Sequence, residues 1–349
     1  MASTLWLFSL LFVFDVVEPI PPHKIMQLDK DMKQFLKDHV AERVSQENKL
    51  KKLTFYIFSP DFINLAYEHS GTQTAVETFH NRRGNCLSFT LMFVAMARHV
   101  GLNARFQEVY TLPSWERYGR AVALNRHMIA VVSIRGQNIP VDFNPFQERR
   151  ENLSILISDD RAHAQFYNNL GAEYYGNGDA ASALVFFQKA LSLDARVSNT
   201  WTNLGVAYSE LGEYVVAEEA YLEALRLDRF EYTAMSNLAK LYQKTGFPQA
   251  AEKYWHRAES FAKQNPYHNF SQAMKAFNET KYRTAIKFYK LAIAQKDDEH
   301  EFHFELARAY GYLGNLKEAQ LSFNKALALT NDKLVRDHYT HQFEEILKQ

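Results

Sequence analysis

A cysteine, a histidine and an aspartate occur in an order that could support nucleophilic catalysis. Cys86 is the only cysteine among 349 residues, so it cannot form an intramolecular disulfide. It follows Gly84-Asn85 and precedes a long apolar run, where a helix is expected to begin. The free N–H groups and dipole of a helix N-terminus favour an anion, and a thiol at such a position ionises more easily. The position of Cys86 therefore suits a thiolate nucleophile.

His127 and Asp142 would supply a base and a carboxylate to orient it. Residues 104–110, 127–134 and 138–143 form strand-like runs, and the last two are joined by a turn at 135–137. A short hairpin would place His127 and Asp142 side by side on adjacent antiparallel strands. A neighbouring imidazolium can lower the pKa of a thiol to roughly 3–4, and a carboxylate fixes the histidine tautomer. Packing of the cysteine helix across the hairpin would complete a Cys-His-Asp triad.

Helices are expected around this hairpin. Apolar residues at helical spacing predict one helix over residues 24–48, a second over 73–80, and a buried helix over 87–100 that ends at Gly101. Taken singly, a cysteine at the start of a buried helix and a histidine on a strand are more often ordinary structural residues. The functional interpretation depends on their order and context together.

The same stretch resembles the transglutaminase-like superfamily. The resemblance lies in G-x-C opening a buried helix, followed by G-L-N-A-R, H-M-I-A-V-V and V-D-F-N-P, within about residues 65–146. It implies an α+β, papain-like domain over 23–155, with Cys86 as nucleophile, His127 as base and Asp142 as orienting acid. Family members often carry tryptophans where this chain has Met128 and Ile139-Pro140. That departure leaves the substrate contacts open.

The second half of the chain repeats one pattern every 34 residues. A Leu-Gly pair or its equivalent stands at 170–171, 204–205, 238–239, 272–273 and 306–307, and alanines and aromatics recur after each. Small residues let antiparallel helices approach closely, and aromatics fill the space beside the contact. The pattern resembles the tetratricopeptide repeat. It implies an all-α solenoid of five repeats over 164–331 and a capping helix over 332–349.

This resemblance also implies that the first helix of each repeat lines a concave face that binds a protein or peptide. Helical spacing predicts a mixed polar and aromatic lining made of Asn168, Asn199, Thr202, Ser236, Lys240, Tyr267, Phe270, Met274, Phe304 and Arg308. The recurrent Lys/Asn set that clamps a C-terminal carboxylate in some family members is not found in it. Alternatively, the repeats pack on their own N-terminal domain, and both interpretations can hold.

Charge and motifs argue against several classes of function. The 40 basic and 40 acidic residues balance to a net charge of +0, which disfavours nucleic-acid binding. The sequence contains no phosphate-binding loop, dinucleotide-binding glycine pattern or metal-binding cluster, so no cofactor and no metal are expected. His300 and His303 lie one helical turn apart, and we interpret them as part of a solvated helix face rather than as metal ligands.

The N-terminus predicts export. Residues 5–14 are almost wholly apolar and are followed by Pro19, Pro21 and Pro22. Such a run is too short for a spanning helix, which needs about 20 residues, but it suits a secretory signal. Because no Lys or Arg precedes it and no A-x-A site follows, residues 1–22 form either a signal peptide or a membrane anchor. We expect an exported, periplasmic or membrane-anchored protein; the alternative is a cytoplasmic protein with a buried N-terminal helix.

Three classes of function remain open. A cysteine protease or amidase would cleave an amide bond through an acyl-enzyme on Cys86 that water resolves. A transglutaminase would resolve the same intermediate with an amine, whose access the loop at 112–124 would control. An inactive adaptor would use the repeats alone to assemble partners. The complete residue set favours an enzyme, and the bacterial members of the superfamily favour a hydrolase, with the repeats recruiting a protein or peptide substrate.

Overall fold

The structure is a computed structural model. It describes residues 17–40, 43–59, 61–68, 71–109, 115–118, 121–124, 127–143, 154–264, 266–330 and 332–347. Most of the predicted export segment, residues 1–16, lies outside this set. No helix among these residues is both long enough and apolar enough to cross a membrane.

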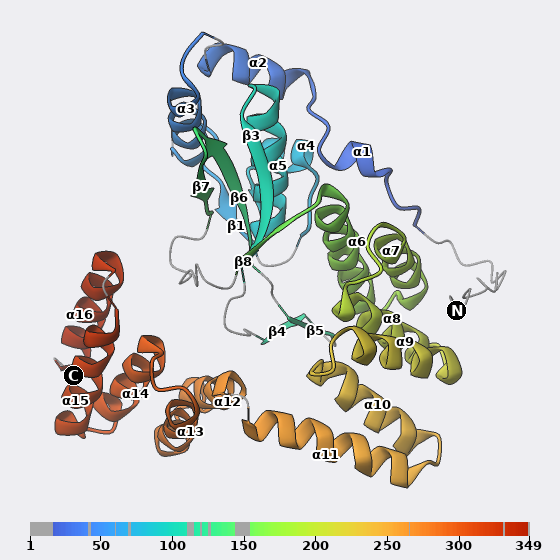
Figure 1. Cartoon of the computed structure of the whole chain (residues 1–349), viewed down its shortest axis with the longest axis vertical. Coiled ribbons are helices and arrows are strands. Elements are labelled where there is room, and N and C mark those ends of the chain that lie inside the picture. Colours follow the sequence, from blue (N-terminus) through green and yellow to red (C-terminus); the bar gives the residue numbers. More distant parts are fainter. Residues whose placement is uncertain are drawn as a thin grey trace.

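The N-terminal half combines short helices with a small sheet (Figure 1). The helices are α1 (Pro22–Ile25), α2 (Lys30–His39), α3 (Gln46–Phe58), α4 (Ala75–Asn81) and α5 (Cys86–His99). The strands are β1 (Ala66–Tyr67), β2 (Arg83–Gly84), β3 (Asn103–Val109), β4 (Trp115–Tyr118), β5 (Ala121–Leu124), β6 (His127–Ile134), β7 (Gln137–Val141) and β8 (Ser154–Ile157). This arrangement confirms the α+β class.

The single helix predicted over 24–48 is wrong, because the chain forms three helices there. Asp29 accepts a hydrogen bond from the Met32 N–H and begins α2, and Ser45 accepts one from the Asn48 N–H and begins α3. A side-chain oxygen that caps a new helix competes with continuation of the preceding one. The spacing of apolar residues indicated helical structure correctly, but it did not reveal the N-caps at Asp29 and Ser45 that divide the segment into separate helices.

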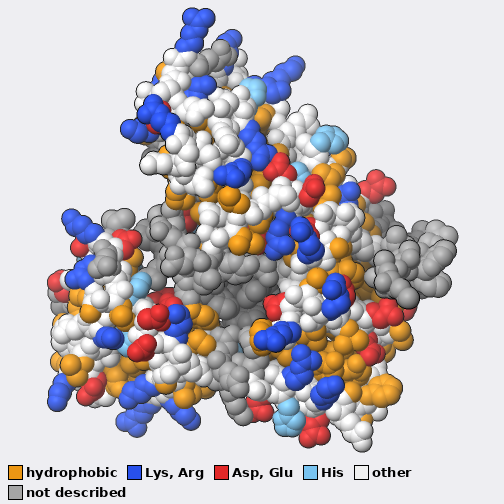
Figure 2. Space-filling view, in the orientation of Figure 1, with side chains coloured by type: hydrophobic (Ala, Val, Ile, Leu, Met, Phe, Trp, Pro, Cys, Tyr) orange, Lys and Arg blue, Asp and Glu red, His pale blue; other side chains and the backbone are white. Residues whose placement is uncertain are grey.

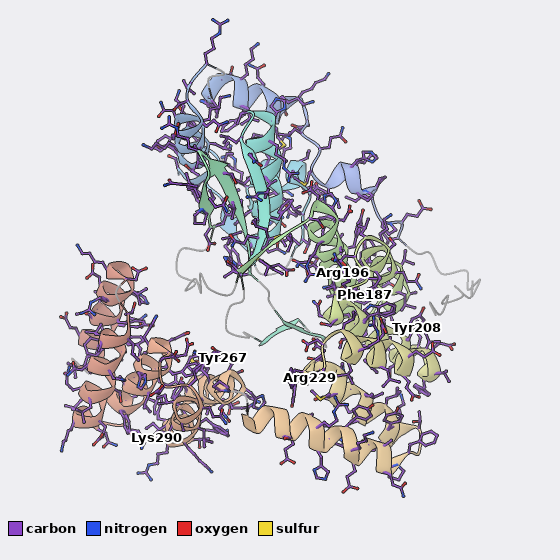
Figure 3. The ribbon with its side chains drawn as sticks, in the orientation of Figure 1. Phe187, Arg196, Tyr208, Arg229, Tyr267 and Lys290 are labelled. Carbon is purple, nitrogen blue, oxygen red and sulfur yellow. The ribbon has the colours of Figure 1, made fainter. Side chains whose placement is uncertain are left out.

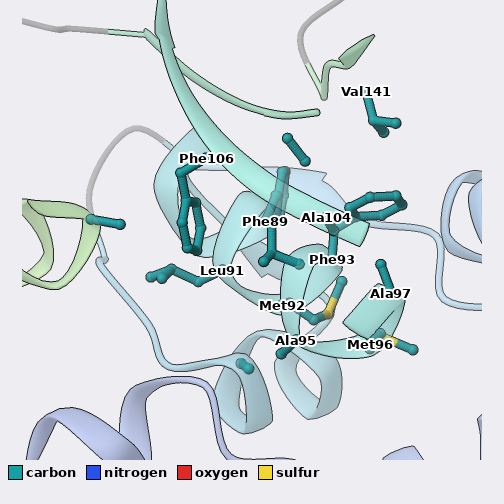
Figure 4. Packing of buried hydrophobic residues seen from close by; sticks show 14 of the residues in the cluster. Phe89, Leu91, Met92, Phe93, Ala95, Met96, Ala97, Ala104, Phe106 and Val141 are labelled. Atoms are coloured by element: carbon teal, nitrogen blue, oxygen red, sulfur yellow. The ribbon is translucent and has the colours of Figure 1, made fainter. Parts of the chain in front are cut away.

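A four-stranded antiparallel sheet, in the order β7-β6-β3-β8, packs against α5. Every residue of α5 from Leu87 to Ala97 is buried, which explains why the helix is apolar on all sides. Figure 4 shows Phe89, Phe93 and Phe106 within this core. The helix ends before Gly101, whose φ of +82° suits glycine. The predicted central helix is therefore confirmed, together with its burial.

The C-terminal half is a run of helices joined by short turns. Within the described residues, five pairs follow one another: α6 (Asp159–Gly176) with α7 (Ala180–Leu193), α8 (Ser198–Glu210) with α9 (Tyr214–Leu227), α10 (Tyr232–Lys244) with α11 (Pro248–Gln264), α12 (Pro266–Asn278) with α13 (Tyr282–Gln295), and α14 (His300–Tyr312) with α15 (Leu316–Leu329). A last helix, α16 (Lys333–Leu347), follows. The succession confirms the expected all-α solenoid.

The repeated small and aromatic residues make the contacts that their spacing predicted. A Cβ on Gly171 would lie 2.6 Å from the ring of Phe187, and one on Gly205 would lie 2.7 Å from the ring of Tyr221. Only glycine allows the paired helices to approach this closely. Phe187 lies between the first and second pairs, with Tyr208 packed against the same cluster (Figure 3).

The first helix pair packs directly on the N-terminal half. Phe166 and Tyr167 of α6 and Phe186 of α7 belong to the same hydrophobic core as α5 and the sheet. Glu108 on β3 is 1% exposed and forms a salt bridge of 3.0 Å with Arg161 of α6. The alternative that the repeats pack on their own N-terminal domain therefore holds for the first repeat.

Charged groups are mixed over the visible face of the molecule. Figure 2 shows basic and acidic side chains interspersed over the helix pairs and mainly basic ones at the top of the N-terminal half, with hydrophobic side chains gathered over part of the helix pairs. Val215 on α9 is 72% exposed and is the most accessible of the large hydrophobic residues described. The mixture agrees with the balanced composition.

Candidate active site

Asn85 and Thr90 position the cysteine helix. Asn85 is the N-cap of α5, and its Oδ1 accepts hydrogen bonds from the Ser88 N–H at 2.9 Å and from the Ser88 hydroxyl at 3.0 Å. Cys86, the first residue of the helix, is partly exposed. Thr90 Oγ1 lies 2.7 Å from the Cys86 carbonyl oxygen and 3.0 Å from that of Met128 on β6. These contacts fix the start of the helix beside the strand that begins at His127.

The β6–β7 hairpin brings His127 and Asp142 together. Its two-residue turn has positive φ at both positions, +50° at Arg135 and +80° at Gly136, as a tight hairpin requires. The turn fixes the register, in which Ile134 pairs with Gln137. Asp142, one residue beyond β7, then lies next to His127, with 2.7 Å between its Oδ1 and the imidazole Nε2. The predicted hairpin is confirmed, although its second strand ends one to two residues earlier than expected.

His127 is placed between a carboxylate and a thiol. Its side chain is 4% exposed, and this burial alone would lower the pKa of the imidazole. The hydrogen bond to Asp142 and that to Cys86 act in the opposite direction and together raise the pKa of His127 to about 9. Because Nε2 faces Asp142, Nδ1 is the nitrogen left for the thiol. The structure thus brings together all three residues that the sequence singled out.

The positions where tryptophans are frequent in the resembled family have a different character here. Met128 is 1% exposed and belongs to the core. Ile139 and Pro140 line a hollow of about 490 Å³ between β7 and α3, which reaches Asp142. Leu50 of α3 forms part of the opposite wall. Ile139 and Pro140 thus line this side of Asp142 together with the polar side chains of α3.

The segment between β3 and β6 approaches the first repeat. Strands β4 and β5 pair antiparallel, with Trp115 opposite Leu124, and lie next to α6 (Figure 1). The rest of the loop predicted at 112–124 lies outside the described residues. The part of this segment that the structure describes therefore lies close to the helix on which the first predicted lining residue stands.

The predicted lining of the repeat face is wrong for five residues. Asn168, Thr202, Ser236, Phe270 and Phe304 occupy equivalent positions 34 residues apart, and each is at most 8% exposed. Their side chains pack between helices, so they cannot line an accessible surface. The following residue in each helix is turned by about 100°. This one-residue error explains why a whole row of predicted residues is buried.

The next position along α6, α8 and α10, the first helices of the first three pairs, is an asparagine in each case. These residues, here called the asparagine row, are Asn169, Asn203 and Asn237. All three are partly exposed, and Asn203 Nδ2 donates to Asn168 Oδ1 at 3.0 Å. The sequence analysis missed this row, although the 34-residue repeat of one residue type was the signal that could have found it. Of the other predicted lining residues, Asn199 is half-buried, Lys240 is exposed, and Arg308 is 24% exposed and paired with Glu305.

The aromatic residues of the fourth and fifth pairs serve the packing of helices instead. Phe270 stacks on Phe302, with 4.6 Å between ring centroids. Phe304 stacks on Tyr339 of α16, with centroids 3.8 Å apart and planes within 8°. The last helix therefore covers part of the surface that we expected the fifth repeat to present, in keeping with a capping role.

The histidine pair on α14 is not the solvated face that the sequence analysis expected. His303 is 8% exposed, and its Nε2 lies 2.9 Å from the Asp297 carbonyl oxygen. His300 Nδ1 lies 2.9 Å from the Tyr339 hydroxyl. His303 thus contacts the connection before α14, and His300 contacts the capping helix α16.

Comparison with known proteins identifies both halves. A profile described as the transglutaminase-like superfamily matches residues 34–143. Three tetratricopeptide-repeat profiles match residues 164–196 and 300–333, 198–230, and 233–258. No curated protein matches the chain significantly.

Solved structures of repeat proteins are similar to about half of this chain. YrrB, described as a TPR protein with an unusual peptide-binding site, is 22% identical over 51% of this chain and 92% of its own, with a TM-score of 0.27. MamA from Desulfovibrio magneticus RS-1 is 17% identical over 48% of this chain and 94% of its own, with a TM-score of 0.28. The Cut9–Hcn1 complex matches at 20% identity over 52% of this chain and 36% of its own, with a TM-score of 0.28.

The matched residues 34–143 contain the cysteine helix, the hairpin and the three residues that meet between them. The repeat profiles cover the first, second and fifth helix pairs and part of the third. The chain therefore carries a transglutaminase-like core domain within its N-terminal half and a protein-binding solenoid of tetratricopeptide repeats in its C-terminal half.

Proposed function

We propose that this protein is a cysteine-dependent amide hydrolase, a peptidase or amidase, whose repeats recruit a protein or peptide substrate. The observation that carries the proposal is His127, whose Nε2 lies 2.7 Å from Asp142 Oδ1 and whose pKa is raised by Asp142 and by Cys86. A purely structural role for a buried histidine would not require both a carboxylate and a thiol beside it.

The chemistry follows from that arrangement. The Cys86 thiolate attacks the amide carbonyl, and a bond forms from sulfur to carbon. The imidazolium of His127 then gives its proton to the leaving amine as the C–N bond breaks, which leaves a thioester on Cys86. Neutral His127 takes a proton from water, whose oxygen attacks the thioester and releases the acid. Asp142 holds the Nε2–H tautomer and stabilises the charged ring.

The N-terminus of α5 supplies part of the electrostatic support. The backbone N–H of Cys86 lies in the first turn, where helix N–H groups lack partners within the helix. A developing oxyanion next to Cys86 Sγ would be stabilised by this N–H and by the helix dipole. We expect this group to act as one donor of an oxyanion hole.

The asparagine row supports recruitment of a peptide. Each amide side chain offers one carbonyl acceptor and two N–H donors, which is the complement of a peptide unit. Asn169, Asn203 and Asn237 repeat on successive first helices, so that an extended segment could meet several in turn. Asn169 lies on α6, the helix closest to the catalytic half. A segment held along the row would thus have one end near the Cys86 side of the molecule.

Activity is tested with the full chain and a peptide library, read by mass spectrometry. Cleavage by the wild type that is lost in Cys86→Ala and His127→Ala supports the hydrolase. The triple variant Asn169→Ala, Asn203→Ala, Asn237→Ala should raise KM for long peptides and leave short amides unaffected. A wild type that cleaves nothing, and whose Cys86 reacts with iodoacetamide no faster than a free thiol at pH 6, would contradict the proposal.

Amine transfer is the second candidate, because the same thioester would serve it. The experiment that separates the two adds a small primary amine to the cleavage assay. A product that carries the amine, formed in preference to the acid, would assign a transglutaminase, whereas unchanged acid would assign the hydrolase.

We also propose that the protein acts outside the cytoplasm, on the strength of the apolar run at residues 5–14. Cell fractionation with N-terminal sequencing tests this. Recovery in the soluble cytoplasmic fraction with an intact N-terminus would refute export, and recovery in the membrane fraction with an intact N-terminus would support an anchor.

A further inference from the structure

We infer that Glu173, a residue of the first repeat, is a positioning residue for the nucleophile. The inference rests on the proposed function and concerns how the cysteine helix is held at its start. Glu173 lies on α6, 87 positions after Cys86 in the sequence, and reaches the loop before α4.

Three donors converge on one oxygen of Glu173. Its Oε1 accepts hydrogen bonds from the Gly71 N–H at 3.3 Å, from the Thr72 N–H at 2.9 Å and from the Thr72 hydroxyl at 2.8 Å. Gly71 has a φ of +102°, which turns both N–H groups toward the carboxylate. Hydrogen bonds to a carboxylate are about twice as strong as neutral ones. The loop at 71–72 is therefore held in part by Glu173 of the first repeat, in addition to contacts within the N-terminal half.

The same Thr72 hydroxyl holds the cap of the cysteine helix. Because it donates its proton to Glu173, its lone pairs are free to accept, and it accepts from Asn85 Nδ2 at 3.1 Å. Thr72 and Asn85 are each 7% exposed, so water does not replace these bonds easily. The amide of Asn85 is thereby oriented with Oδ1 toward the helix, where it accepts from Ser88.

Ser88 closes the network. Its hydroxyl donates to Asn85 Oδ1 at 3.0 Å and accepts from the Gln73 N–H at 2.9 Å, and its side chain is fully buried. Both hydroxyl protons between Glu173 and Ser88, those of Thr72 and Ser88, thus have one assigned acceptor each. The network ends on both sides of Cys86, at residues 85 and 88, and so fixes the first turn from which Sγ meets His127.

Two polar residues of α6 that reach the catalytic half, and an asparagine between them, lie on one face of the helix. Gln165, Asn169 and Glu173 are four residues apart and line up one above the other. Gln165 donates to Glu108 on β3, Glu173 accepts from Thr72, and Asn169 of the asparagine row stands between them. In the second and third pairs, the equivalent helix face exposes an asparagine to solvent. In the first pair, this face also carries Glu173, which holds the loop before α4.

The test measures two properties of the full chain. The first is the rate of Cys86 alkylation by iodoacetamide from pH 5 to 9. The second is the hydrogen exchange of the Thr72, Gln73 and Ser88 amides, which does not depend on catalysis. Glu173→Ala should slow alkylation at pH 6 by about fivefold, the equivalent of losing a helix cap, and move its pH midpoint upward. Exchange at the three amides should rise by a similar factor.

Conservative variants separate positioning from general damage. Glu173→Gln keeps a carbonyl acceptor and should recover most of the alkylation rate. Thr72→Ser keeps the hydroxyl and should behave like the wild type. Thr72→Val lacks the hydroxyl and should behave like Glu173→Ala. The double variant Thr72→Val, Glu173→Ala should cost no more than either single change, because both interrupt one network. The matched control is Glu318→Ala, an exposed glutamate on α15, which should change neither property.

Failure of the inference and failure of the proposed function give different results. If wild-type Cys86 alkylates quickly at pH 6 and Glu173→Ala leaves both its rate and the three exchange rates unchanged, the positioning role is refuted and the hydrolase stands. If wild-type Cys86 reacts as an ordinary thiol, the hydrolase is refuted; faster exchange in Glu173→Ala would then still support the network, and unchanged exchange would refute it.

Discussion

Asp142→Asn is expected to release the proton that His127 holds. The pKa of His127 is raised from 6.5 to about 9, against the effect of burial. That difference, about 2.5 pH units, corresponds to about 3 kcal/mol in favour of the imidazolium. Asparagine keeps the size of the side chain but removes the charge. Burial would then be opposed by Cys86 alone, so we expect the pKa of His127 to fall by at least about 1 unit.

The assay is a proton NMR titration of the His127 ring, assigned with His127→Gln. The free energy of unfolding as a function of pH provides a second measurement, and the direction of its change can be predicted. Because the folded pKa of His127 lies above the unfolded value, its contribution to stability is complete below about pH 6.5 and is lost as pH rises through about 9. The wild type should therefore lose up to about 3 kcal/mol of unfolding free energy across that window, and Asp142→Asn should lose much less.

The control is Asp337→Asn, an exposed carboxylate on α16, which should titrate and unfold like the wild type. The reasoning is refuted if His127 in Asp142→Asn titrates within about half a unit of the wild-type value. It is also refuted if the two proteins lose stability in parallel between pH 6.5 and 9.

Three further outcomes are expected from the packing. Arg161→Met removes the guanidinium that pairs with the buried Glu108 on β3 and should cost about 3–5 kcal/mol by denaturant unfolding, less if α6 shifts to admit water. Gly205→Ala places a Cβ 2.7 Å from the Tyr221 ring and should cost about 1–3 kcal/mol; an unchanged midpoint would show that the two helices can separate. Tyr339→Ala removes the stack on Phe304 and should raise hydrogen exchange in α14 and α16 only, so faster exchange in α6 would contradict it.

The site could be predicted from sequence because its parts carry local signals. The turn residues Arg135 and Gly136 and the alternation of apolar residues around them indicated the hairpin, and Asn85 before an apolar run indicated the start of a helix. The 34-residue period indicated the repeat helices in the same way. The hairpin and the helix start depend on short local patterns, whereas the repeat helices are indicated by a pattern that recurs along the chain.

What the sequence could not indicate depends on contacts between distant residues or on small rotations. The bond between Glu173 and Thr72 joins positions 101 residues apart and leaves no local pattern. The lining of the repeat face was misassigned because one residue in a helix changes the direction of a side chain by about 100°. The break between α2 and α3 was missed because the apolar spacing continues across the cap at Ser45.

The shared core of the first repeat has a consequence for how such a chain can change in length. Repeat solenoids gain and lose units readily, since each unit touches only its neighbours. Here Phe166, Tyr167 and Phe186 belong to the core of the N-terminal half, so the first unit cannot be deleted or exchanged without opening that core. Duplication and loss should therefore be confined to the units after it. In a swap between chains, the part that must be moved as one piece would run through α7, and the exchangeable repeats would begin at α8.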